Sequence, residues 1–381
     1  MRAADTRPFL NGMCYVYEFT KGMVPPERAA ALMRALNVKS VRSWSHITWL
    51  LKDPDTADKE HCGEFHRVYA LLRECGVEQL VGMSHTWFYP KDCPNVPGDA
   101  FSVPRRDMAE GSVYRRFLDM YERAWQTLAA EFPEITYWET GNEQNHDPFL
   151  HPLDYTADPE KNKFTLREKA EISCDMMLYA ARGIKRANPS AHIIQPGMAP
   201  IGEHGLGVVA DNVRVDYAGM EQTMKAIYEI IESGQCGSSD PRDYFDSLCW
   251  HPYYARQMAD GSWKWQVPDD AWVEMNNAIY QVAVDHGDDG IDCYFSEFGY
   301  NDFGDGATDH ELVEHVLTGT EIIREKMPYV ASVHAYRMFE MLDVADTLDT
   351  YAFFHVDQDG SIHPKERVYA LQRAYGGTLP L

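Results

Sequence analysis

The feature that most constrains the fold is an alternation of short apolar segments with longer amphipathic ones, repeated eight times along 381 residues. The short segments are rich in β-branched and aromatic residues, and the long ones carry apolar residues at helical spacing. Eight strands, each followed by a helix, predict a (β/α)8 TIM barrel. The predicted strands are 10–17, 38–44, 79–86, 135–142, 192–197, 247–253, 293–298 and 332–338. The predicted helices are 26–36, 63–74, 113–131, 166–187, 220–232, 270–284, 310–325 and 365–375.

An open doubly wound α/β sheet is the main structural alternative. That fold normally carries a glycine-rich phosphate-binding turn after its first strand. The first predicted strand reads NGMCYVYEFTKG, which contains neither GxGxxG nor GxxxxGK[ST]. Barrel domains of roughly 200 to over 400 residues are common, and no low-complexity linker divides this chain. We therefore expect a single domain over 1–381, with long rim loops at about 89–111 and 255–268.

The chain is strongly acidic, with 59 Asp and Glu against 35 Lys and Arg and a net charge of −24. Such a charge repels phosphates and anionic lipids, which argues against nucleic-acid and membrane partners. No run of 18 apolar residues exists, and charges interrupt the opening segment MRAADTRPFL, so no signal peptide is expected. The eight cysteines form no CxxC pair, which favours reduced thiols and a cytoplasmic location. The sequence carries no signal for an oligomeric state.

Acidic side chains stand at two of the predicted strand ends, where (β/α)8 barrels place their functional residues. The fourth strand ends in YWETGNEQN, with Asn142 and Glu143 at the rim, and the seventh ends in YFSEFGY, with Glu297 there. These strands lie across the barrel mouth from each other, so the two carboxylates can face one another. Carboxylates about 5–5.5 Å apart serve retaining glycosidases as nucleophile and acid/base, whereas about 6.5–9.5 Å indicates inversion. Glu139 falls within the strand, and we interpret it as structural.

These segments resemble glycoside hydrolase clan A, a group of retaining (β/α)8 enzymes, with WETGNEQN and SEFGY most similar to families 39 and 5. The resemblance implies that Glu143 is the acid/base, that Glu297 is the nucleophile and that Asn142 binds the sugar 2-hydroxyl. It also implies substrate or nucleophile contacts at other strand ends from Arg42 in VRSW, His85 in MSHTWF, and His251 and Tyr253 in WHPYY. The tail, DQDGSIHPKERVYALQRAYG, resembles the clan's short hairpin before the last helix. No cofactor is implied.

One position departs from the clan's pattern. The clan usually carries a tryptophan at the end of strand eight as a floor beneath the cleaved sugar, whereas this chain reads HAYRMFEML. Tyr336, Met338 or Phe339 must take that place, and we select Tyr336 as a substrate contact. Sugars present apolar faces that stack on aromatic rings, so Trp87 and Trp265 are further candidates for substrate binding. For a single loop tryptophan, anchoring the loop to the barrel is the more common role.

Two other functions stay open. The first is a metal-dependent barrel isomerase or hydrolase, which would use histidines near strand ends: His46, His85, His251 and His334. The chain lacks HExxH and an HxH on its first strand, so we assign no metal. The second is a carbohydrate-binding barrel without catalysis, which would require Glu143 and Glu297 to be far apart. The sequence favours a retaining glycoside hydrolase with a β-linked carbohydrate substrate and no cofactor.

Overall fold

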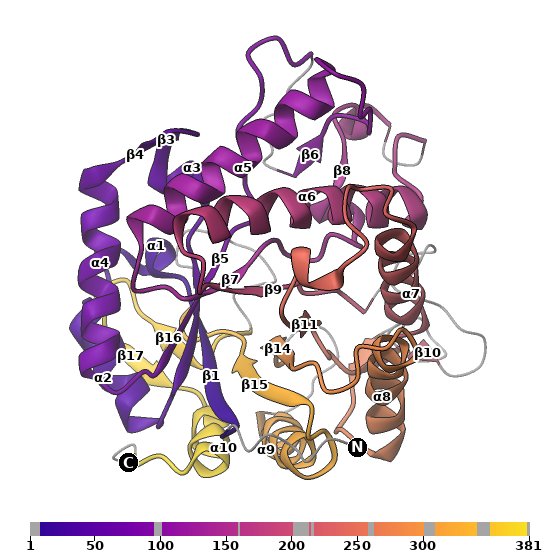
Figure 1. The fold of residues 1–381 in the computed structure, drawn as a ribbon. Coiled ribbons are helices and arrows are strands. Elements are labelled where there is room, and N and C mark those ends of the chain that lie inside the picture. Colours follow the sequence, from indigo (N-terminus) through magenta and orange to yellow (C-terminus); the bar gives the residue numbers. More distant parts are fainter. Residues whose placement is uncertain are drawn as a thin grey trace.

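Eight parallel strands form the centre of the molecule in a computed structural model, which describes residues 8–94, 101–158, 161–200, 213–214, 217–257, 263–300, 309–340 and 351–378 (Figure 1). The strands are β1 (Leu10–Tyr15), β2 (Ser40–Trp44), β5 (Gln79–Met83), β7 (Tyr137–Glu139), β9 (His192–Ile194), β11 (Leu248–Cys249), β14 (Cys293–Phe298) and β15 (Val330–Ala335). They follow one another in chain order, and β15 returns to pair with β1. Between β9 and β11 the sheet continues as the isolated parallel bridges Ile194–Ser247 and Met198–Trp250. The predicted (β/α)8 barrel is confirmed.

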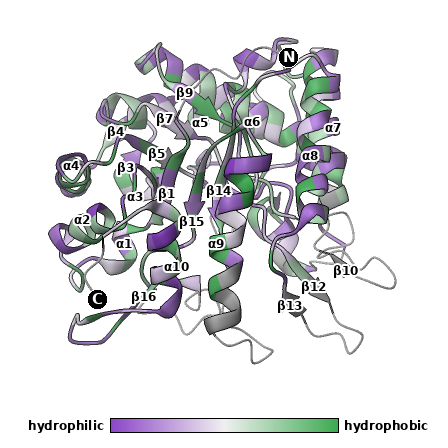
Figure 2. Ribbon diagram, turned by 90° about the horizontal axis from the view of Figure 1, so that it is seen from below, coloured by the Kyte–Doolittle hydropathy of each residue, from purple (hydrophilic) through white to green (hydrophobic). Residues whose placement is uncertain are grey.

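Eight long helices surround these strands, and each corresponds to a predicted helix. They are α2 (Pro26–Ala35), α4 (Lys59–Glu74), α5 (Val113–Glu131), α6 (Leu166–Ala187), α7 (Tyr217–Ser233), α8 (Asp270–Asp285), α9 (Asp309–Lys326) and α10 (Glu366–Tyr375). Side-chain caps explain where several begin, because Ser112, Thr165 and Asp269 accept hydrogen bonds from the first-turn amides of α5, α6 and α8. Figure 2 shows apolar and polar stretches alternating along α7 and α8, as expected of amphipathic helices.

Most strands are shorter than the sequence predicts. The fourth was expected over 135–142 and the sixth over 247–253, whereas β7 and β11 hold only three and two residues. Beyond β7 the pairing continues as a single bridge between Asn142 and Gly197. Glu143 then adopts a φ of +46°, in the left-handed region, which cannot continue a strand. Regular strand pairing therefore stops before the mouth of the barrel, and the candidate residues Asn142 and Glu143 lie where it stops.

The interior of the barrel changes character along the strands. A small cluster of Val81, Ile194, Cys249 and Tyr294 fills its lower part and is separate from the main core between the sheet and the helices. Towards the carboxyl ends the interior becomes polar, with Arg42 and other charged side chains buried there. Buried charges need partners, so this end must be a connected polar network.

Short elements decorate the rim. In the expected 255–268 segment, β12 (Ala255–Gln257) and β13 (Trp263–Trp265) form an antiparallel hairpin that β10 (Val213–Arg214) extends. In the 89–111 segment, β6 (Ser102–Val103) pairs with β8 (His151–Pro152), and 95–100 lie outside the described residues. An antiparallel pair, β16 (Phe354–Val356) and β17 (Ile362–Pro364), precedes α10 as the tail motif predicts. The remaining short elements are α1 (Tyr17–Thr20), α3 (Ile47–Leu50), β3 (Leu51–Asp53), β4 (Thr56–Ala57), η1 (Asp147–Phe149), η2 (Tyr155–Ala157) and η3 (Pro241–Asp243).

Two further features concern the helices and the cysteines. In the described ranges, the helices are all too short or too polar to cross a membrane. All eight cysteines are free thiols, and all but Cys75 and Cys93 are buried.

Candidate active site

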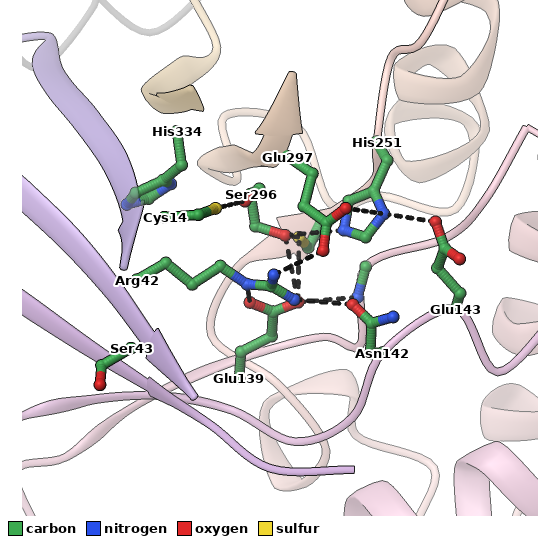
Figure 3. Close-up of polar contacts among 12 residues, drawn as sticks. Cys14, Arg42, Ser43, Glu139, Asn142, Glu143, His251, Ser296, Glu297 and His334 are labelled. Atoms are coloured by element: carbon green, nitrogen blue, oxygen red, sulfur yellow. Dashed lines mark hydrogen bonds and ion pairs between the residues drawn. The ribbon is translucent and has the colours of Figure 1, made fainter. Parts of the chain in front are cut away.

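A buried arginine organises the polar end of the barrel (Figure 3). Arg42 on β2 donates from Nε and Nη2 to the two oxygens of Glu139, at 2.6 and 2.9 Å. Its Nη1 donates to Oε1 of Glu297 at 2.7 Å, and Nη2 also donates to Oδ1 of Asn142 at 2.8 Å. Arg42 and Glu139 are wholly buried, so each charge depends on the other for stability. The guanidinium therefore fixes β2, β7 and β14 relative to one another.

A β-bulge sets the direction of Glu297. Between Phe295 and Phe298, β14 holds one more residue than the facing stretch of β15. In a regular strand Ser296 and Glu297 would point to opposite faces, but the extra residue lets both side chains reach the polar interior. Figure 3 shows the side chains of Ser296 and Glu297 pointing toward Arg42.

Glu297 is held by donors on both oxygens. Oε1 accepts from Arg42, and Oε2 accepts from the hydroxyl of Tyr253 at 2.9 Å. The residue is only 6% exposed, and its position is fixed by these two hydrogen bonds. A fixed, buried carboxylate is suited to act as a nucleophile.

Glu143 lies directly after Asn142 at the end of the fourth strand. Its backbone amide donates to the carbonyl of Gly197 at 2.7 Å, which stabilises the left-handed backbone there. Its Oε1 lies 2.7 Å from Nδ1 of His251. Burial raises the pKa of Glu143, but the hydrogen bond and charge of His251 outweigh it and lower that pKa. Burial lowers the pKa of His251, yet the charges of Glu297 and Glu143 raise it overall.

The two predicted catalytic carboxylates converge. One carboxylate oxygen of Glu143, one of Glu297 and one ring nitrogen of His251 all lie within 4.8 Å of one another. A retaining pair of carboxyl groups stands about 5–5.5 Å apart, and an inverting pair about 6.5–9.5 Å. The two carboxylates are therefore close enough to contact the same bound molecule.

Ser296 connects the two halves of this network and was not singled out from the sequence. Its Oγ donates to Oε1 of Glu139 at 3.1 Å and lies 3.0 Å from Nε2 of His251. The thiol of Cys249 donates to Oγ of Ser296 at 3.1 Å. Because strand alternation places neighbours on opposite faces, nothing in the sequence indicated that Ser296 would join Glu297.

Aromatic rings line the Glu297 side of the site. Ring centroids of Tyr253 and Trp265 are 6.2 Å apart, and Tyr351 lies 5.8 Å from Tyr253 and 6.1 Å from Trp265. Tyr336, at the end of strand eight, lies 5.6 Å from Tyr351. Burial, with the charge of Glu297, keeps the pKa of Tyr336 well above its ordinary value, so its hydroxyl stays a donor. Sequence reasoning did not find Tyr351, which follows the undescribed segment 341–350 and no predicted strand.

The structure separates the three candidates for the strand-eight floor. Tyr336 is the one whose ring joins the aromatic group beside Tyr253, through Tyr351 at 5.6 Å. Met338 is wholly buried in the core, and the ring of Phe339 packs against Tyr15 and Phe354.

His85 follows β5, where the sequence places it. Its buried ring lies 4.3 Å from that of His46 and 5.0 Å from that of Phe101, and burial lowers its pKa to about 3. His85 is thus a neutral ring among aromatic side chains. His334 lies deeper in the barrel, where Nε2 is 2.8 Å from Oγ of Ser40.

The substrate-binding assignment of Trp87 is corrected by the structure. Its indole is 2% exposed and packs against Phe117 and Tyr121 of α5. Its Nε1 donates to the carbonyl of Ser102 at 2.9 Å. Residue 87 lies beyond the end of β5, and its ring turns away from the mouth to anchor the 89–111 segment.

Within the described residues, Glu143, His251 and Glu297 are also the one group of His, Cys, Asp and Glu side chains compact enough to reach a single ion. Their proximity already has an explanation, because His251 hydrogen-bonds Glu143 and Tyr253 hydrogen-bonds Glu297. The guanidinium of Arg42, 2.7 Å from Glu297, would repel a divalent cation. We assign no metal to the group.

The fold and this pair of carboxylates define a class of (β/α)8 barrels with facing acids on strands four and seven. Beta-glycosidase BGL167 is similar, with a TM-score of 0.64 and 14% identity over 98% of each chain. A family 39 glycoside hydrolase from Bacteroides cellulosilyticus WH2 has a TM-score of 0.59 and 14% identity, over 99% of this chain and 65% of that one. A beta-glucosidase from Exiguobacterium marinum has a TM-score of 0.59 and 11% identity over 97% of each chain. No family model and no curated protein matches the sequence. At these identities the similarity shows the fold.

Proposed function

We propose that the protein is a retaining glycoside hydrolase that cleaves β-linked sugars. The observation that carries the proposal is the convergence of Glu143 and Glu297, from strands four and seven, to within 4.8 Å. The names of the structural neighbours, beta-glycosidases and a family 39 glycoside hydrolase, support the same activity.

The reaction proceeds in two displacements. Glu297 attacks the anomeric carbon and forms a glycosyl ester, while a proton from Glu143 passes to the departing glycosidic oxygen. Glu143 then removes a proton from a water molecule, whose oxygen attacks the anomeric carbon and releases Glu297. Both steps are supplied by the chain's own carboxylates.

Other residues bind and orient. Asn142, held by Arg42, faces the mouth beside Glu143 and is assigned to the sugar 2-hydroxyl. Tyr253 and Arg42 hold Glu297 in position through hydrogen bonds, and Trp265 and Tyr336 supply aromatic faces for the sugar. His85, a neutral ring after β5, is assigned to a substrate contact. The ligand is a carbohydrate, the catalytic unit is one barrel over 1–381, and the free cysteines support a cytoplasmic enzyme.

Replacing either carboxylate tests the assignment. Glu297→Ala should lower hydrolysis of nitrophenyl glycosides by at least about 10⁴-fold, because no covalent intermediate can form. Glu143→Ala should lower hydrolysis of natural glycosides far more than that of activated aryl glycosides, whose leaving groups need no proton. The matched control is Glu74→Ala, on the exposed end of α4, which should keep wild-type rates. Wild-type turnover by Glu297→Ala would disprove the proposal.

The stereochemistry and the metal alternative are tested together. Proton NMR of the first product should show the anomer of the substrate, since two displacements retain configuration. Turnover should survive dialysis against EDTA. Loss of turnover with EDTA and its return with a divalent cation would favour the metal-dependent isomerase or hydrolase.

A further inference from the structure

A continuous chain of hydrogen bonds joins the deepest carboxylate of the site to the acid/base (Figure 3). It runs from Glu139 to Ser296 at 3.1 Å, from Ser296 to Nε2 of His251 at 3.0 Å, and from Nδ1 of His251 to Glu143 at 2.7 Å. Three of these residues are buried to within a few per cent of complete coverage, and Glu143 is half-buried. The direction of each bond follows from the number of protons available.

The first bond has only one allowed direction. Glu139 is ion-paired through both oxygens with Arg42, so it is a carboxylate and can only accept. Ser296 must therefore donate its single hydroxyl proton to Glu139, because two lone pairs facing each other at 3.1 Å would repel. Ser296 Oγ retains two lone pairs, and Cys249 donates to one of them. Burial holds the pKa of the Cys249 thiol well above its ordinary value, so it keeps its proton.

The second bond follows from the first. With its proton committed to Glu139, Ser296 can only accept from His251, so Nε2 of His251 carries a hydrogen. Nδ1 of His251 and Oε1 of Glu143 then face each other at 2.7 Å, and a hydrogen bond of that length needs one proton between them.

We propose that Ser296 and Glu139 fix the protonation of His251, so that His251 and Glu143 share a single proton, and that this shared proton is the one delivered to the leaving group. Ser296 and Glu139 are then positioning residues that act on the acid through His251. The inference deepens the proposed glycoside hydrolase function and rests on it.

The titratable and charged groups around His251 come from strands two, four, six and seven and from the segments after them: Arg42, Glu139, Glu143, Cys249, Tyr253 and Glu297. The charges of Glu297 and Glu143 favour a proton on the imidazole, whereas the charge of Arg42 opposes it. The pKa of His251 is raised and that of Glu143 is lowered, so the resting pair holds its proton nearer to the imidazole. The pair as a whole is neutral, and Glu297 carries the negative charge that the first displacement consumes.

Proton and charge balance in both steps. In the first step the shared proton forms the O–H bond of the leaving group, the glycosidic C–O bond breaks, and a C–O bond to Glu297 forms. The pair changes from neutral to −1 while Glu297 changes from −1 to a neutral ester. In the second step a water proton returns to the pair, and Glu297 recovers its charge. The net charge beside Arg42 therefore stays constant through the cycle.

Nitrogen-15 NMR of the histidine rings tests the proton assignment without any need for activity. His251, assigned by its loss in His251→Gln, should keep a proton on Nε2 from pH 5 to pH 8, and Nδ1 should lose its proton within that range or above it. A resting state with Nδ1 protonated and Nε2 bare would overturn the proposal. If the wild type cleaves no glycoside, the proposed function fails, whereas the NMR result still decides the protonation of His251.

A serine variant tests the positioning role. Ser296→Ala frees His251 from its fixed tautomer, so the ring should populate both neutral tautomers. Hydrolysis of glycosides with poor leaving groups should fall at least tenfold more than that of activated aryl glycosides, since only the former need the proton. The matched control is Ser332→Ala, a buried serine of β15 that donates to the carbonyl of Leu10 and does not touch the network. Equal losses for both substrate types would show a structural role only and contradict the proposal.

Discussion

Arg42 shows how one side chain can assemble a site from three strands. Its planar guanidinium bridges Glu139, Glu297 and Asn142 with four short hydrogen bonds. No ammonium group could reach these acceptors together, since the fork geometry is specific to arginine. The arginine also compensates two buried negative charges, so a change at this position alters both the charge balance and the position of Glu297.

Removing Arg42 should therefore damage stability and activity together. Arg42→Met leaves Glu139 buried without its cation, and breaking a buried pair costs about 3–5 kcal/mol. We expect urea titrations to show this decrease in the free energy of unfolding, and we expect glycoside hydrolysis to fall below detection. The double variant Arg42→Met/Glu139→Met should recover part of the stability, because the wholly buried charge of Glu139 is removed together with its partner, but no activity, because Glu297 still lacks its cation. Arg28→Met, on the exposed face of α2, serves as the control and should behave as wild type.

At the scale of elements, close backbone approaches position the acid pair. A Cβ built on Gly197 would lie 2.3 Å from Nε2 of His251 and 3.1 Å from Oε1 of Glu139. Glycine at the end of strand five thus makes the space in which His251 reaches both Ser296 and Glu143. The bulge in β14 has a similar effect on the other side, because it directs Ser296 and Glu297 into one interior.

Gly197→Ala should displace the His251 ring without unfolding the barrel. We expect kcat/KM to fall at least tenfold, with the larger effect on poor leaving groups, and a stability loss of about 1–3 kcal/mol from overpacking. Gly63→Ala is the matched control, since nothing lies within 4 Å of a Cβ at that position of α4. That variant should keep full activity and gain about 0.5–1 kcal/mol in urea titrations. Wild-type kinetics for Gly197→Ala would show that residue 197 does not determine the position of the His251 ring.

At the scale of the whole molecule, buried neutral histidines make stability depend on pH. Burial lowers the pKa of His85 and His334 to about 3 and that of His315 to about 4. The same cause holds the pKa of His46 well below its ordinary value. In the unfolded chain each histidine titrates near pH 6.5. The unfolded state therefore binds more protons below that pH, and acid favours unfolding.

We expect the free energy of unfolding to be level above pH 7 and to fall between pH 6.5 and pH 4, by roughly 1 kcal/mol per pH unit for each such histidine. His251 acts in the opposite sense, because its pKa is raised, but it is outnumbered. Urea titrations at pH 7.5, 6 and 5 measure the slope. His334→Gln should reduce it, whereas His363→Gln, on the exposed β17, should leave it unchanged. A slope that does not respond to His334→Gln would contradict this account.

The barrel could be predicted from the sequence alone, because the alternation of apolar strands with amphipathic helices is a local property of each segment. The sequence also predicted that Asn142, Glu143 and Glu297 stand at strand ends, since position along a strand is local too. The matching helix bounds, several set by side-chain caps, have the same origin.

The directions of the side chains at the mouth depend on tertiary packing and could not be predicted from the sequence. The bulge that brings Ser296 beside Glu297 exists in the pairing of β14 with β15, and neither strand alone encodes it. The ring of Trp87 turns outward because α5 offers it an apolar surface, and Tyr351 joins the site from a distant segment. The direction of each of these side chains depends on neighbouring residues that are far apart in the sequence. The acids were therefore predictable, and the network that sets their protons was not.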